Sequence, residues 1–223
     1  PNNIVAEGGI ESFATGGNRV YGGDIQLSGT NTIALFESNI PGATNPVNQE
    51  RQIFFNGRVS GTGITLNVFG SNNGNPFYLT SGSNAITGTI NLNPNAVLEA
   101  RSPGSVGINS GDVTINMATN SRLLLRHWQN GDYRTNVVVN GHAEINSDRL
   151  VSYGGGLQQF LSINELTVNG DDNIVSFGGG NNYNNNNNYN NNYNNNNNNN
   201  CTGEVTGFTL VRGGTSGDVG QLF

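Results

Sequence analysis

The stretch GITLNVFGSNNGNPFYLTSGSNAITGTINL, residues 63–92, decides the fold of this chain. It holds three short runs that are rich in β-branched and aromatic residues, and Gly, Asn or Ser follows each of them. The runs are 63–69, 77–80 and 85–92. Runs of this length between turn-forming residues are typical of β-strands. Leu66 and Ile90 occupy similar places in the first and third runs, 24 residues apart. The stretch therefore predicts a unit of short strands that repeats about every two dozen residues.

The same pattern extends over most of the chain. The other predicted strands are 24–28, 32–37, 52–55, 96–100, 112–117, 122–127, 135–140, 143–146, 162–169, 173–177 and 206–211. Turn signals such as Asn56-Gly57 and Asn140-Gly141 follow almost every run. No apolar stripe at helical spacing reaches a useful length. The sequence predicts an all-β protein.

A ladder of apolar residues gives the repeat its length. Its members are Leu66, Ile90, Val113, Val137 and Leu161. A smaller echo brings Val139-Asn140-Gly141 back as Val168-Asn169-Gly170. Such a repeat predicts a parallel β-solenoid, or β-helix, with coils of about 24 residues that stack about 4.8 Å apart. Asparagine suits its corners, because it tolerates left-handed backbone and can hydrogen-bond to an asparagine in the next coil.

An antiparallel β-sandwich or jelly roll is the alternative fold, since it also has short strands and frequent turns. The length of 223 residues fits one solenoid domain, 1–223, with a low-complexity insertion at 181–200. That insertion contains only Asn and Tyr. We interpret it as a flexible insertion, as a hypervariable placeholder, or as an ordered segment with stacked asparagines. In the ordered case, the tyrosines that pack between them are Tyr183, Tyr189 and Tyr193.

Composition excludes several classes of protein. Only 11% of the residues are charged, the formal net charge is −6, and all nine basic residues are arginines. Binding to nucleic acid needs a basic surface, so we expect no nucleic-acid partner. No stretch reaches the roughly 18 apolar residues of a membrane span. Cys201 is the single cysteine, which rules out an intramolecular disulfide.

Two segments resemble a known family. The sequence FNGRVSGTGITL, residues 55–66, resembles the F-x-G-x-I-S-G-x-G-x-L-x-L part of the autotransporter-associated β-strand repeat. Residues 78–90, YLTSGSNAITGTI, resemble its continuation, L-x-L-S-G-x-N-x-Y-x-G-x-T-x-V, except that Ile86 stands where the family usually has Tyr. The resemblance implies a right-handed parallel β-helix from a bacterial surface protein or passenger domain, and an extracellular or cell-surface location. It transfers no catalytic residue.

Candidates for catalysis or metal binding are few. His127 and His142 belong to no H-x-x-x-H pattern, and the chain has no G-x-S-x-G, so we interpret both histidines as structural. Asp171 and Asp172 form an acidic pair, and Asp148 lies 23 residues before Asp171, at a spacing that would stack the two. Acidic clusters of this kind bind Ca²⁺ or act as general acid and base in solenoid polysaccharide lyases and hydrolases. Solvated turn residues are the alternative. We expect no catalytic residue, metal or cofactor.

A second candidate surface combines arginine with aromatic rings. It consists of Arg126, Trp128, Tyr133 and Arg134. Stacking and bidentate hydrogen bonds would suit a sugar or an anion, so surface polysaccharide is a possible partner. The alternative is that the arginine stems merely cover apolar strand surface.

The two ends of a solenoid suggest a further role. Each end presents unpaired backbone groups, and the sequence shows no capping helix near Ile4 and Val5 or near Leu222 and Phe223. We therefore predict a non-enzymatic extracellular structural protein that assembles with itself, end to end or by strand donation, into a filament, fibre or sheath. The alternatives are a carbohydrate-binding or polysaccharide-degrading β-helix and a fragment of an adhesin passenger.

Overall fold

Strands of this protein form two parallel β-sheets. The computed structural model describes residues 3–7, 12–13, 18–36, 52–70, 74–127, 129, 131–149, 159–169, 175–178 and 201–211. The eleven strands of the first sheet, here the long sheet, are β1 (Ile4–Glu7), β2 (Ser12–Phe13), β4 (Ile25–Ser28), β5 (Thr30–Phe36), β7 (Val59–Phe69), β9 (Ala85–Leu92), β11 (Val113–Met117), β13 (Gly131–Asp132), β14 (Asn136–Val139), β16 (Gln159–Asn169) and β18 (Cys201–Val211). The seven strands of the second, here the short sheet, are β3 (Arg19–Tyr21), β6 (Ile53–Phe55), β8 (Pro76–Leu79), β10 (Val97–Ala100), β12 (Ser121–His127), β15 (Ala143–Arg149) and β17 (Val175–Gly178).

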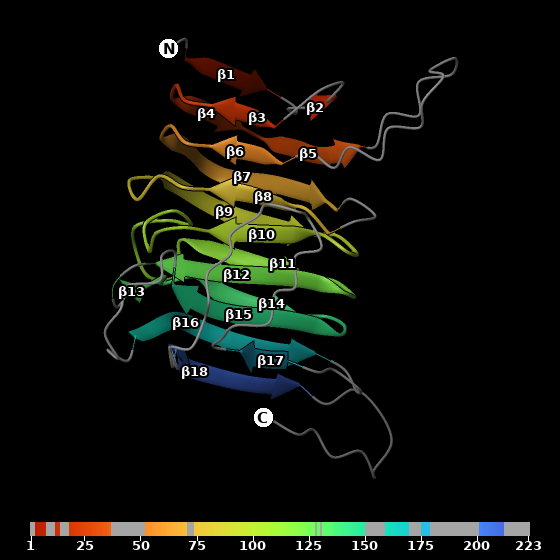
Figure 1. Ribbon diagram of the computed structural model, residues 1–223, viewed down its shortest axis with the longest axis vertical. Coiled ribbons are helices and arrows are strands. Elements are labelled where there is room, and N and C mark those ends of the chain that lie inside the picture. Colours follow the sequence, from red (N-terminus) through yellow and green to blue (C-terminus); the bar gives the residue numbers. More distant parts are fainter. Residues whose placement is uncertain are drawn as a thin grey trace, which may run out of the picture.

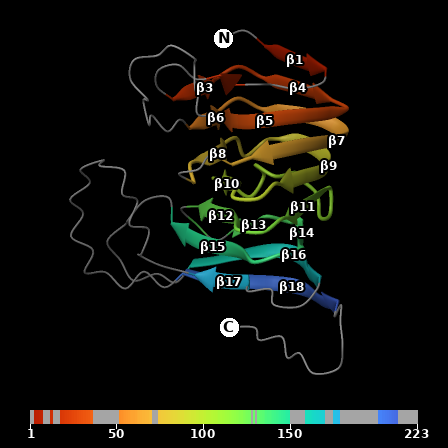
Figure 2. The same ribbon diagram turned by 90° about the vertical axis from the view of Figure 1, so that its right-hand side faces the viewer.

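The chain winds between the two sheets as a β-solenoid. From β6 onward it passes alternately through the short sheet and the long sheet, and each coil takes about 25 residues. Figure 1 shows the coils stacked from β1 to β18, and Figure 2 shows the two sheets as opposite walls. Strand pairs such as β7 with β9 and β8 with β10 are parallel. The predicted solenoid is thus confirmed, and the sandwich alternative, which requires antiparallel pairing, is wrong.

Strand register corrects the predicted ladder of apolar residues. The column that the long sheet forms is Leu66, Ile90, Ile115, Val137 and Leu166. Val113 and Leu161 are not part of it, because Val113 pairs with Gly88 and Leu161 with Gly131. The prediction assumed nearly equal coils, whereas the corner at residues 101–112 is much longer than the corner before β10.

Inward side chains from both sheets fill the space between them. In β11, Val113, Ile115 and Met117 are buried while the two residues between them are half-exposed, as the alternation of a strand requires. On the short sheet, Phe55 packs edge-to-face against Phe77, with ring centroids 4.8 Å apart. Burial of these columns supplies most of the stability of the coil stack.

Asparagine side chains link the coils on the outside. Asn91 donates to Asn67 at 2.8 Å and Asn116 donates to Asn91 at 2.9 Å, so three coils share one ladder in the middle of β7, β9 and β11. At a corner, Asn169 donates to Asn140 at 2.8 Å, and Val139 pairs with Val168 in the same register. The echo in the sequence therefore marks adjacent coils, and the ladders occur on strand faces as well as at corners.

Two further contacts fix the distance between coils. Asn84, which is 0% exposed, accepts a hydrogen bond from the Val59 N–H at 2.7 Å and donates to the Ser105 carbonyl at 2.8 Å. Gly57 lies directly against the carbonyl of Gly23 in the preceding coil, so that a Cβ at position 57 would overlap this oxygen. Both positions tie three neighbouring coils into one stack.

Replacing Gly57 by alanine should destabilise the protein. The added methyl meets backbone rather than a flexible side chain, so the coils must separate locally, at a cost of about 1–3 kcal/mol. Gly22→Ala is the matched control, because nothing lies within 4 Å of a Cβ built there. Thermal unfolding followed by circular dichroism measures the difference. Equal unfolding temperatures for the two variants would contradict the close packing at Gly57.

Asn84→Ala should also destabilise the stack, by about 2–4 kcal/mol, because it leaves the buried Val59 N–H and Ser105 carbonyl without a partner. Asn116→Ala is the control. It removes a single hydrogen bond at the end of a half-exposed ladder and should cost no more than about 1 kcal/mol. Urea unfolding of both variants tests the contrast, and similar losses would refute the bridging role of Asn84.

Candidate functional site

The ends of the solenoid carry open sheet edges. Within the described part of the chain, β1 pairs only with β4, and β18 pairs only with β16. Figure 1 places these two strands at opposite ends of the molecule. Every described strand pair in the long sheet is parallel, so both edges run in the same direction along the sheet. Open edges of this kind are templates for pairing with another strand.

Backbone alternation directs the groups of β1. The Ile4 N–H donates to the Asp24 carbonyl at 2.9 Å, which places Ile4 on the side that faces β4. In a parallel ladder, the next residue turns its N–H and C=O the other way, so those of Val5 point to the open edge. Val5 is also 65% exposed, whereas Ile4 packs against the core. Of the predicted assembly residues, Val5 is thus free at the edge and Ile4 belongs largely to the interior.

The other residues predicted for self-assembly cannot be placed. Leu222, Phe223, Tyr183, Tyr189 and Tyr193 all lie outside the described residues. Their roles stay predictions.

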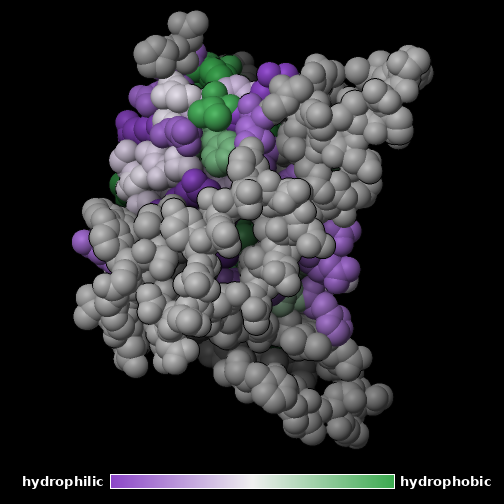
Figure 3. Space-filling model, in the orientation of Figure 1, coloured by the Kyte–Doolittle hydropathy of each residue, from purple (hydrophilic) through white to green (hydrophobic). Residues whose placement is uncertain are grey.

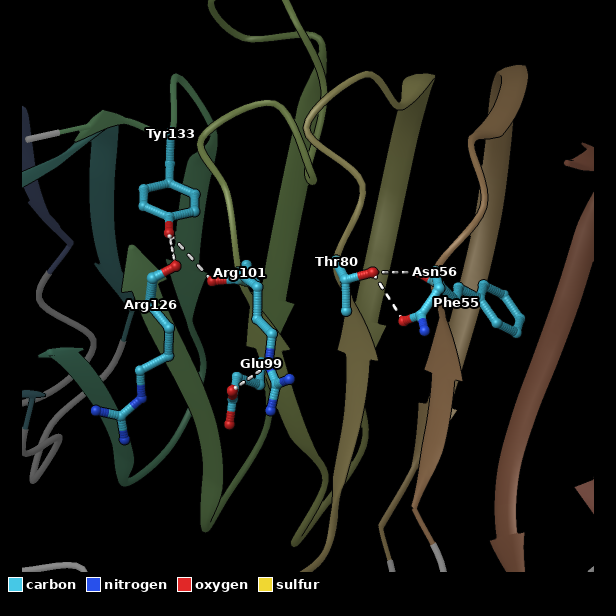
Figure 4. Close-up of polar contacts among 8 residues, drawn as sticks. Phe55, Asn56, Thr80, Glu99, Arg101, Arg126 and Tyr133 are labelled. Carbon is cyan, nitrogen blue, oxygen red and sulfur yellow. Dashed lines mark hydrogen bonds and ion pairs between the residues drawn. The ribbon is translucent and has the colours of Figure 1, made fainter. Parts of the chain in front are cut away.

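A cluster of aromatic and charged side chains occupies the outer face of the short sheet. Phe54 and Tyr78 stack with ring centroids 4.1 Å apart and planes 5° from parallel. The Arg101 guanidinium lies 4.4 Å from the Tyr78 ring centroid, and its Nε donates to Glu99 at 2.7 Å (Figure 4). We call Phe54, Tyr78, Glu99 and Arg101 the aromatic–arginine cluster. Sequence reasoning missed it, because only the strand register shows that Phe54, Tyr78 and Glu99 share one row.

Burial governs the chemistry of this cluster. Tyr78 is 5% exposed, and loss of solvent raises its pKa above the usual range of a phenol. The Glu99 carboxylate adds to the rise in pKa, while Arg101 and Arg126 oppose it. Tyr78 therefore stays a neutral phenol at ordinary pH, and the covered ring serves to pack neighbouring coils.

Apolar surface lies beyond this cluster, nearer the N-terminal end. Figure 3 shows green residues in the upper part of the same face, where β1, β3 and β6 lie. Val20 in β3 is exposed there. The face thus becomes more apolar toward the end of the stack that carries β1.

Tyr133 does not belong to a sugar-binding surface. It is 0% exposed, and its hydroxyl shares a proton between the carbonyl oxygens of Arg126 at 2.8 Å and Ala100 at 3.1 Å (Figure 4). The prediction that this ring stacks on a ligand is wrong, because the ring points into the core. Instead, Tyr133 satisfies backbone carbonyls of the short sheet from inside the solenoid.

The two arginines of that predicted surface lie on different elements. Arg126 is in β12 of the short sheet, whereas Arg134 follows β13 of the long sheet and has a left-handed backbone, with φ at 54°. Arg134 donates to the Ile108 carbonyl at 3.0 Å, and its Nε lies 3.5 Å from Asp132. Arg134 is therefore engaged with its own corner. Trp128 lies outside the described residues.

The predicted acidic corner is only partly described. Asp148 is in β15, where its backbone is in register with Arg126 of β12. Asp171 and Asp172 lie outside the described residues, so the structure does not test whether these carboxylates meet.

The histidines occupy ordinary positions near turns. His127 places Nδ1 3.0 Å from the Gln129 carbonyl, and the carbonyl of His142 accepts from the Asn120 N–H at 2.6 Å. Among the described residues, no three His, Cys, Asp or Glu side chains gather as a metal ion would require. Over the same residues, no helix has the length and apolar character of a membrane span.

The fold rests on strand pairing and burial alone, so we compared the chain with known proteins. No family model, curated protein or solved structure matches it. The resemblance of residues 55–66 and 78–90 to the autotransporter-associated repeat stays a prediction about ancestry.

The raised pKa of Tyr78 predicts a loss of stability at high pH. Above pH about 10, the unfolded chain releases this proton while the folded protein keeps it, so unfolding is favoured as the pH rises. The wild type should then lose up to about 1.4 kcal/mol per pH unit more than Tyr78→Phe, which has no proton to release at this position. Urea unfolding of both proteins on either side of pH about 10 measures this difference, because all other titrations are common to both. Parallel losses would contradict the covered position of Tyr78.

Proposed function

We propose that this protein is a non-enzymatic, extracellular structural subunit whose copies stack end to end into a filament, fibre or sheath. The observation that carries the proposal is the pair of open parallel edges, β1 at one end and β18 at the other. A β1 strand from one copy pairs in parallel with the β18 edge of the next and continues the long sheet. This contact is heterologous and does not close, so it generates a fibre.

The composition of the edge strands supports such pairing. Proteins that must stay monomeric protect sheet edges with Lys, Pro, bulges or coverings. Strand β1 reads IVAE and β18 reads CTGEVTGFTLV, with neither Lys nor Pro in either. Each strand carries one glutamate as its sole charge, and the exposed Val5 gives β1 an apolar outer surface. Both edges therefore lack the usual protection against another strand.

Low charge supports long stacks of copies. The net charge of −6 is spread over 223 residues, so like charges that meet at the coil spacing are few. The extracellular location rests on the resemblance of residues 55–90 to repeats of bacterial surface proteins. The carbohydrate-binding alternative has lost one of its stacking residues, because Tyr133 is buried.

Val5→Pro should abolish or shorten the filaments. Proline removes the N–H that points to the next copy, while the hydrogen bonds of Ile4 to β4 remain, and proline leaves the preceding residue in an extended conformation that suits a strand. The variant should therefore remain folded as a monomer. Val5→Thr is the control, because it retains both the N–H and a β-branched side chain. Light scattering and negative-stain microscopy measure assembly, and circular dichroism measures folding.

Two results would contradict the proposal. One is a wild-type protein that stays monomeric at high concentration. The other is a Val5→Pro variant that forms filaments as readily as Val5→Thr, since the edge of β1 would then play no part in assembly.

A further inference from the structure

The outer face of the long sheet carries a regular array of threonine and asparagine. In four neighbouring strands, β5, β7, β9 and β11, two outward residues stand on either side of one inward residue. The first row, held in register by strand pairing, is Thr30, Thr65, Thr89 and Thr114. The second row, two residues later in each strand, is Thr32, Asn67, Asn91 and Asn116. We call these two rows the Thr/Asn array.

Backbone geometry fixes the spacing of the array in both directions. Neighbours within a row are about 4.8 Å apart, which is the distance between strands, and the rows are about 6.6 Å apart, which is two residues of an extended strand. Threonine has few side-chain rotamers, and the 2.8 Å and 2.9 Å hydrogen bonds of the asparagine ladder hold the second row in place. The array is thus a nearly rectangular lattice of hydroxyl and amide groups with little freedom to move.

The first row is free to bind an external partner. The hydroxyl groups of Thr65, Thr89 and Thr114 make no hydrogen bond to another described residue, and none of these side chains is buried. In Figure 2, β4, β7 and β9 form the right-hand side of the molecule, and no labelled strand of the short sheet lies outside them. Neither row contains a charged or an aromatic residue.

We propose that the Thr/Asn array binds the surface of ice. A flat lattice that repeats in two directions matches a ligand that also repeats in two directions, whereas a small soluble ligand would contact only one or two of its groups. Water molecules in ice repeat at distances close to those of the array. Each threonine offers a hydroxyl group that takes the place of a lattice water, beside a methyl group that orders the water next to it.

Chemistry favours ice over the other periodic surface, crystalline polysaccharide. Aromatic rings combine an apolar body with a polar handle and are suited to stacking on sugar rings, but the array has none. Charged polymers would require arginine or carboxylate, and the array has neither. Small neutral side chains, fixed in position and half-exposed, are suited to an uncharged lattice of water.

The experiment compares two variants that add the same charge on opposite faces. Thr89→Lys places an ammonium group in the centre of the array, and the control Val20→Lys places one on the outer face of the short sheet, where Val20 is 60% exposed. Purified full-length protein is frozen slowly onto a cold probe, and the fraction that enters the ice is measured, together with thermal hysteresis and crystal shape. Circular dichroism confirms folding, and Thr65→Lys in the neighbouring strand replaces Thr89→Lys if the latter does not fold.

We expect the wild type and Val20→Lys to enter the ice and to shape its crystals, and Thr89→Lys to lose both properties. The proposal is overturned if the wild type is excluded from ice, if Val20→Lys loses as much as Thr89→Lys, or if the wild type is retained by insoluble cellulose or chitin but not by ice. This face is distinct from the end strands, so Val5→Pro should enter ice like the wild type. Loss of assembly and loss of ice binding are therefore separable.

Discussion

In-register parallel pairing between coils is the constraint on which the rest of this structure depends. Once Leu66 is paired with Ile90, the period of two along each strand decides which residues enter the core and which face outward. The same pairing puts like residues on top of one another, so the apolar column inside and the asparagine ladder outside are two results of one register. Buried contacts such as Asn84 then need to satisfy only one spacing between coils.

Much of the fold could be predicted from the sequence, because strands and corners leave local signals. The strand at Ala85–Leu92 has the bounds that the alternating pattern predicts. No pattern predicts β1 or β3, since runs of four and three residues are too short to show alternation. The predicted ladder fails at Val113 because the length of a corner, here residues 101–112, follows from packing and leaves no periodic signal.

The candidate sites were harder to predict, because they depend on the direction of single side chains. Tyr133 follows a strand of two residues and precedes Arg134, whose left-handed backbone turns the chain at that point. Sequence spacing cannot show that such a corner points the tyrosine ring inward. Phe54, Tyr78 and Arg101, in contrast, are distant in sequence and meet only through the register of β6, β8 and β10.

The parallel direction of all strands in the long sheet makes the two ends of the molecule different. One end presents β1 and the other presents β18, and no rotation exchanges them. A chain of such subunits has a direction, as a screw does, and its two tips offer different surfaces to an incoming subunit. Growth rates at the two tips are then unequal. A short capped seed would elongate from one tip only, and the polarity of a whole fibre would be decided by the winding of a single polypeptide.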